Sequence, residues 1–307
     1  MYRQASTSSQ LLLFYLPDMN QISVIFEDAI FLVDLGAATR EFRWPNNSPP
    51  PPSNLKSLEV EKIHERHLGH LLSVTPSLRS LTWTRPYYVG KLSETGGSSA
   101  VYPAIFSLDD IMSSLTLVRD TLTELRLRAV DRTGPCRWGA RRPDVRSLSL
   151  ARFADSATSL SLAQFENLRI LEIPNVFIMG NIQYESADSF LQRPILQTNL
   201  PPRLEELTLT GKLAPIFISH CEFDSRQEIP YLDQILSWLE DPEFSNSCHL
   251  RKLGYYSNWT DEELREESAE VHLRKRHILM DITLKAGIDF VFEYPPPSQD
   301  MEALGEI

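Results

Sequence analysis

The chain has 307 residues, of which 42% are hydrophobic and 23% charged, as in an ordinary folded protein rather than a disordered one. Its 30 basic and 41 acidic side chains give a net charge of -11, which argues against a nucleic-acid or anionic-membrane partner. Cys136, Cys221 and Cys248 are scattered and odd in number, which favours reduced thiols in an intracellular protein, cytoplasmic or nuclear. The apolar stretches are too short, or too interrupted by charge, for a signal peptide or a transmembrane helix.

A short phrase recurs along the chain: an apolar residue, two variable residues, an apolar residue, one variable residue and a third apolar residue. Its eight copies occupy residues 19–24, 55–60, 78–83, 122–127, 145–150, 168–173, 204–209 and 250–255. Copies that begin at Leu55 and Leu78, and at Leu122, Val145 and Leu168, are 23 residues apart, within the roughly 20 to 29 residues of leucine-rich repeats. The longer intervals indicate insertions.

The recurrence predicts an α/β fold, a leucine-rich-repeat solenoid with a curved, mostly parallel sheet on the concave side and helices or irregular segments on the convex side. About eight irregular repeats would fill residues 11–294, between a disordered N-terminus at 1–10 and a loose tail at 295–307. Apolar residues three or four apart predict returning helices at 63–72, 111–118, 190–196 and 232–239. A capping box at 260–263 predicts a long helix, and residues 288–294 a closing strand.

The alternation within each strand predicts which side chains point away from the core. Most of these side chains are small or polar: Ser57, Glu59, Glu61, Ser80, Thr82, Thr84, Glu124, Arg126, Arg128, Ser147, Ser149, Ala151, Ile170, Glu172, Pro174, Glu206, Thr208, Thr210 and Tyr256. Such a shallow surface suits a protein ligand better than a small substrate, although a surface without any partner is the alternative. At the ninth repeat position, apolar residues such as Ile63 and Val176 replace the usual Asn or Cys, which predicts turns held by apolar packing.

The segment from Arg126 to Arg152 is rich in arginine: it contains eight arginines and only two acidic residues, both aspartates. The segment is either a solvated turn paired with acidic neighbours or a docking patch for an acidic protein segment or a phosphate, because arginine offers forked donors. The predicted partner-binding residues on the concave face and the basic turn are Glu124, Arg126, Arg128, Arg141, Arg142 and Glu172. Reversing Arg126 and Arg128 to Glu is expected to weaken partner binding and to leave the fold intact.

Three other features have a structural and a functional interpretation each. The insertion at 85–104 carries Tyr87, Tyr88 and Tyr102 and is either a recognition loop or flexible decoration. The histidines at positions 64, 67 and 70 share one helical face; they either hold a metal or form a solvated face, and we predict no metal. The prolines at 49–52 form a stiff spacer or a ligand for an aromatic-lined module. No nucleophile elbow or dinucleotide fingerprint is present, so we predict no catalytic residues and no cofactor.

Two segments resemble the leucine-rich half of fungal F-box proteins: Pro-Pro-Arg-Leu-Glu-Glu-Leu-Thr-Leu at 201–209 and Leu-Gly-His-Leu-Leu-Ser-Val-Thr-Pro at 68–76. The resemblance covers residues 11–294 and implies a non-catalytic protein-interaction module like the substrate-recruiting repeats of a ubiquitin-ligase receptor. This chain opens almost directly on a repeat strand, so we expect the cullin-ligase adaptor as a partner only if an F-box exists outside it. The alternatives are a repeat-only scaffold with no ligase link and, more remotely, an enzyme.

Overall fold

The computed structural model describes eleven parts of the chain. The described residues are 10–26, 42–87, 91–92, 100–101, 104–131, 151–153, 159–180, 195–211, 229–241, 249–257 and 267–293. The predicted features at 145–150, 190–194, 260–263, Arg141, Arg142, Tyr88 and Tyr102 lie outside these ranges.

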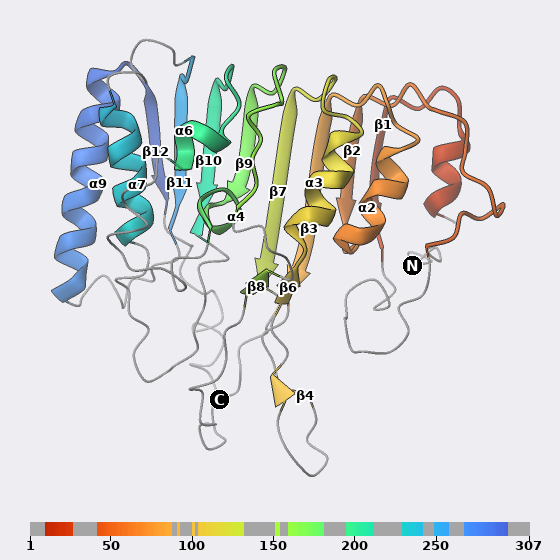
Figure 1. Cartoon of the computed structure of the whole chain (residues 1–307), viewed down its shortest axis with the longest axis horizontal. Helices are drawn as coiled ribbons and strands as arrows, with labels where there is room; N and C mark the ends of the chain where they lie inside the picture. The colour runs from red at the N-terminus through yellow and green to blue at the C-terminus, as the bar shows by residue number, and fades with distance from the viewer. Residues whose placement is uncertain are drawn as a thin grey trace, which may run out of the picture.

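Eight strands form one parallel sheet in which the strands lie side by side in chain order (Figure 1). They are β1 (Gln21–Ile25), β2 (Ser57–Glu61), β3 (Ser80–Tyr87), β7 (Glu124–Asp131), β9 (Ile170–Pro174), β10 (Glu206–Thr210), β11 (Lys252–Tyr256) and β12 (Asp289–Glu293). Two small sheets accompany it: β4 (Lys91–Leu92) pairs antiparallel with β5 (Ala100–Val101), and β6 (Ala104–Phe106) pairs parallel with β8 (Ala151–Phe153). The strands predicted from seven of the eight phrases, and the closing strand, are confirmed.

Helices cover one face of the large sheet, with α9 beyond α7 at the β12 end (Figure 1). They are η1 (Leu12–Tyr15), α2 (Glu65–Leu72), α3 (Leu108–Thr116), α4 (Asn175–Met179), α6 (Ile195–Asn199), α7 (Ile229–Glu240) and α9 (Glu267–Lys285). Spacing of three or four residues explains α2, whose Leu68, Leu71 and Leu72 are fully buried. The Ser107 hydroxyl caps α3 by accepting a hydrogen bond of 3.1 Å from the amide of Asp110. The predicted helices within the described residues are thus confirmed.

The core lies between the sheet and the helices. The central leucine of each phrase pairs with its equivalent on the next strand, and the five such leucines between β2 and β10 are at most 1% exposed: Leu58, Leu81, Leu125, Leu171 and Leu207. Pairs of backbone hydrogen bonds just before and at the start of successive strands keep these strands in register. The amides of Arg79 and Ser80 both donate to the carbonyl of Lys56, at 2.8 and 2.9 Å, and the amides of Thr123 and Glu124 donate in the same way to Arg79.

No strand lies between β7 and β9 in the large sheet, so the expected order of neighbours is wrong there, whereas the strand predicted at 145–150 lies outside the described residues. β7 pairs directly with β9, with Leu125 opposite Leu171 and Arg126 opposite Glu172. The interval from Leu125 to Leu171 is 46 residues, the same as from Leu207 to Leu253. The 46 residues from Leu125 to Leu171 are therefore a single strand-to-strand interval of the large sheet. The eighth strand of that sheet is β12.

The turns after the strands are held partly as predicted. Ile63 and Val176 are fully buried, in agreement with apolar packing at the ninth position. One buried amide was missed: Asn175, one residue earlier, accepts a hydrogen bond of 2.7 Å from the amide of Val176 and contacts the Tyr255 hydroxyl at 3.5 Å. A polar side chain therefore contributes to the turn after β9.

Candidate functional site

The sheet face opposite the core is called the open face. It is made of the side chains that alternate with the core residues on each strand: Gln21, Ser23, Ile25, Ser57, Glu59, Glu61, Ser80, Thr82, Thr84, Glu124, Arg126, Arg128, Ile170, Glu172, Pro174, Glu206, Thr208, Thr210, Lys252, Gly254, Tyr256, Asp289, Val291 and Glu293. Most are half-buried or exposed, as predicted. Gly254 is buried in the middle of β11, and two further members, Pro174 and Thr210, are buried as well. Both end their strands, where the chain turns back toward the helices.

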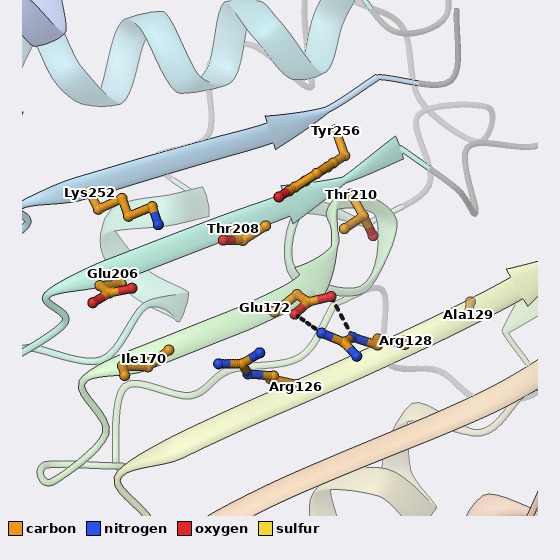
Figure 2. Close-up of a pocket in the computed structure, with 10 residues that line it drawn as sticks. All are labelled: Arg126, Arg128, Ala129, Ile170, Glu172, Glu206, Thr208, Thr210, Lys252 and Tyr256. Carbon is orange, nitrogen blue, oxygen red and sulfur yellow. Dashed lines mark hydrogen bonds and ion pairs between the residues drawn. The ribbon is translucent and has the colours of Figure 1, made fainter. Parts of the chain in front are cut away.

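A depression of about 450 Å³ lies in the open face over β7, β9, β10 and β11 (Figure 2). It is lined by Arg126, Arg128, Ala129, Ile170, Glu172, Glu206, Thr208, Thr210, Lys252 and Tyr256. Short side chains explain the hollow. Thr208 sits beside Gly254, where an added β-carbon would lie 3.1 Å from the Thr208 hydroxyl oxygen.

Arg128 and Glu172 form a two-point ion pair on one side of the depression (Figure 2). The Arg128 Nε and Nη2 atoms each donate to a different oxygen of Glu172, both at 2.7 Å. These hydrogen bonds raise the pKa of the Arg128 guanidinium. The pair uses both carboxylate oxygens, so Arg128 and Glu172 fix each other's orientation and form a rigid wall.

Arg126 is held more loosely. Its Nη2 atom lies 2.6 Å from one oxygen of Glu124, and the other oxygen of Glu124 accepts a hydrogen bond of 3.0 Å from the Ser80 hydroxyl. The Arg126 and Arg128 side chains are equally exposed, at 39%, so the two differ in their contacts and not in their burial. A guanidinium has five N–H donors, so this single contact leaves Arg126 with donors for a ligand.

Glu206 and Lys252, on the neighbouring strands β10 and β11, carry opposite charges that have no partner among the described residues. They are register partners, yet neither forms an ion pair or a side-chain hydrogen bond within the described ranges. At the far end of the same strands, burial raises the pKa of Tyr256, with smaller contributions from Glu293 and Glu172. Its phenol is therefore a neutral hydrogen-bonding group at physiological pH.

The structure brings together four of the six predicted partner-binding residues: Glu124, Arg126, Arg128 and Glu172. It also changes their interpretation, because each arginine is matched by a glutamate. Sequence reasoning missed Lys252, although its place beside the core residue Leu253 would have put it on the open face. Tyr87 of the predicted recognition loop ends β3.

The histidines of α2 do not converge on a metal. The ring centroids of His64 and His67 are 6.4 Å apart, and those of His67 and His70 are also 6.4 Å apart. His70 stacks instead on Phe42, at 4.8 Å. No group of three or more His, Cys, Asp or Glu side chains suited to a metal occurs in the described part of the chain.

Comparison with family models, curated proteins and solved structures found no significant match for this chain. The structure itself defines the class: an α/β protein with an eight-stranded parallel sheet and helices on one face of that sheet. Among the described helices, none combines the length and apolar content needed to cross a membrane.

Proposed function

We propose that the chain is a leucine-rich-repeat solenoid that binds a protein partner on the open face and catalyses no reaction. The observation that carries the proposal is the depression of about 450 Å³, in which apolar surface is mixed with charges and hydroxyls from four neighbouring strands. Its volume is within the range of small-molecule sites, but such sites are lined mostly by apolar side chains, whereas eight of the ten residues that line this depression carry a charge or a hydroxyl. A partner with an extended contact surface fits it best.

The repeat architecture is supported by the order of the strands. Each strand pairs with the next one of the large sheet along the chain, and equivalent leucines stack from β2 to β11. Such nearest-neighbour stacking is how repeat proteins form one extended binding surface. The varied intervals between strands are insertions into that common plan.

The resemblance to fungal F-box proteins suggests the biological setting of such binding. In this proposal the open face recruits a substrate for a ubiquitin ligase, and an F-box outside this chain would supply the contact to the cullin adaptor. A repeat-only scaffold would use the same face without the ligase. Binding to the cullin adaptor distinguishes the two alternatives. A longer protein that carries an F-box should bind the adaptor, a repeat-only scaffold should not, and we expect no binding by this chain alone in either case.

Affinity purification with quantitative mass spectrometry tests the proposal. The double variant Arg126→Gln/Lys252→Gln removes two charges from the depression, and Arg274→Gln/Lys285→Gln removes two charges of the same kind from exposed positions on α9. We expect the first variant to lose partners that the second retains. Identical partner sets for wild type and both variants would contradict binding on the open face.

A further inference from the structure

The charges that line one end of the depression alternate in sign. The Arg126 guanidinium lies toward Ile170 on β9, Glu206 follows on β10, and Lys252 follows on β11 (Figure 2). Ile170, Glu206 and Lys252 are register partners, so they form one row across three adjacent strands. On β7 the register partner of Ile170 is Glu124, which is bound to Arg126, whereas Arg126 itself is the register partner of Glu172. The Arg126 side chain nevertheless reaches toward Ile170, so the row of charges from β7 to β11 is Arg126, Glu206 and Lys252: positive, negative and positive.

The three charges of this row differ from the others in the depression because they still have capacity to bind a ligand. Glu206 and Lys252 have no ionic partner in the described residues, and Arg126 is bound to Glu124 through one of its donors. Arg128 and Glu172, by contrast, satisfy each other through two hydrogen bonds of 2.7 Å. The row therefore provides the charges that are available for recognition.

We propose that the depression binds an extended segment of the partner that carries an acidic, a basic and an acidic side chain at alternate positions. This inference rests on the proposed function and names the chemistry of the partner. Alternate side chains of an extended peptide point to the same side at intervals of about 6.6 Å, whereas β7 and β10 are two strand spacings apart, about 9.6 Å, and β10 and β11 one, about 4.8 Å. Flexible charged side chains can bridge these differences.

The short side chains of β10 and β11 explain why a peptide can approach the row. Thr208 and Gly254 lie next to it and leave the hollow over the sheet. The hydroxyls of Thr208, Thr210 and Tyr256 make no hydrogen bonds to the described residues and can bond to a peptide backbone. In this arrangement the charges of the row determine the order of charged side chains in the peptide, whereas the hydroxyls can bond to the backbone of any peptide.

The open face as a whole disfavours a simple acidic ligand. Seven acidic side chains, Glu59, Glu61, Glu124, Glu172, Glu206, Asp289 and Glu293, stand against the basic Arg126, Arg128 and Lys252. A uniformly acidic peptide would meet repulsion from Glu206 and its surroundings, and a uniformly basic one would meet Arg126 and Lys252. Only the mixed order matches every member of the row.

Three labelled peptides of equal length test the charge order by fluorescence anisotropy with the full chain. The probe contains Glu-Ser-Lys-Ser-Glu, the isomer Lys-Ser-Glu-Ser-Glu has the same composition and net charge, and the inverted peptide is Lys-Ser-Glu-Ser-Lys. We expect the probe to bind at least about fivefold more tightly than either control, since each control places two or more charges opposite like charges of the row. Equal binding of probe and isomer, tighter binding of the inverted peptide or no binding of the probe would overturn the inference.

A charge swap assigns the binding to the row. The variant Glu206→Lys should reverse the preference, so that Glu-Ser-Glu-Ser-Glu binds more tightly than Glu-Ser-Lys-Ser-Glu, whereas Lys285→Gln on α9 should leave the preference unchanged. An unaltered preference in Glu206→Lys would place the peptide elsewhere and overturn the inference. The proposed function fails separately: it falls if Arg126→Gln/Lys252→Gln retains every purified partner, whatever the peptides do.

Discussion

The most deeply buried ion pair of the described residues joins α2 to the end of β3. Glu65 and Arg85 are 1% and 5% exposed, and their side chains form a direct ion pair. The other oxygen of Glu65 accepts a hydrogen bond of 3.0 Å from the amide of Ser107, and the Arg85 guanidinium lies 4.5 Å from the centre of the Phe106 ring. Burial raises the pKa of Glu65, against the opposing charge of Arg85.

Replacing Arg85 with Met tests how strongly this pair holds the helix to the sheet. The change leaves Glu65 buried without its counter-ion, and we expect the free energy of unfolding to fall by about 3 kcal/mol or more. Arg119→Met is the control, because it breaks an exposed pair with Asp120 and should cost about 1 kcal/mol or less. Urea denaturation measures both, and equal losses would contradict a structural role for the buried pair.

His67 predicts a dependence of stability on pH. Burial, with smaller contributions from Arg66 and His70, lowers the pKa of His67 from 6.5 to about 4. The unfolded chain then binds a proton more readily than the folded one between these values, so stability is lost as the pH falls from 6.5 toward 4. In His67→Gln this decrease should be smaller. Unfolding free energies between pH 7.5 and pH 4.5 test it, with the exposed His249→Gln as control; a slope like that of wild type in His67→Gln would refute the assignment.

At the scale of the elements, the sequence predicts where strands occur more reliably than which strands pair with each other. Alternating leucines reveal β2, β3, β7, β9 and β10 because each strand buries every second residue against the helices. The phrase at Val145 satisfies the same pattern, but a pattern of apolar residues does not say which strand is adjacent. The pairing of β7 with β9 depends on long-range packing, which single-sequence spacing does not encode.

The candidate site was predictable to the same extent. Alternation places Arg126 and Arg128 on the open face, and the structure agrees. The pairing of Arg128 with Glu172 was not predictable, because Glu172 is 44 residues away and reaches Arg128 only through the direct pairing of β7 with β9. The hollow also depends on Gly254 and Thr208, whose proximity follows from the register of β10 and β11.

Disulfide trapping tests the order of the strands. With the native cysteines replaced by Ser, the pair Arg126→Cys/Glu172→Cys should cross-link, since register partners on adjacent strands are within the reach of a disulfide. A strand inserted between them would separate the two positions by about 10 Å and prevent the bond. Arg126→Cys/Thr208→Cys, with β9 in between, is the control that should stay reduced. Cross-linking of the control alone would refute the sheet order.

At the scale of the whole molecule, the two faces of the sheet have different roles. Helices bury one face and provide the stability of the fold, whereas the open face presents charges from strands that are far apart in the sequence. The charge pairs proposed between the partner and Arg126, Glu206 and Lys252 predict that binding weakens as ionic strength rises, because salt screens exposed pairs. A partner held mainly by apolar contacts would not show this dependence.

Hydrogen–deuterium exchange of the chain, alone and with a purified partner, tests the central claim most directly. The account predicts that partner binding slows exchange in peptides from β7, β9, β10 and β11, whose side chains line the depression. Peptides from α2, α3, α7 and α9, on the other face of the sheet, should exchange at the same rate in both states. Slower exchange confined to those helices, with the four strands unchanged, would contradict partner binding on the open face.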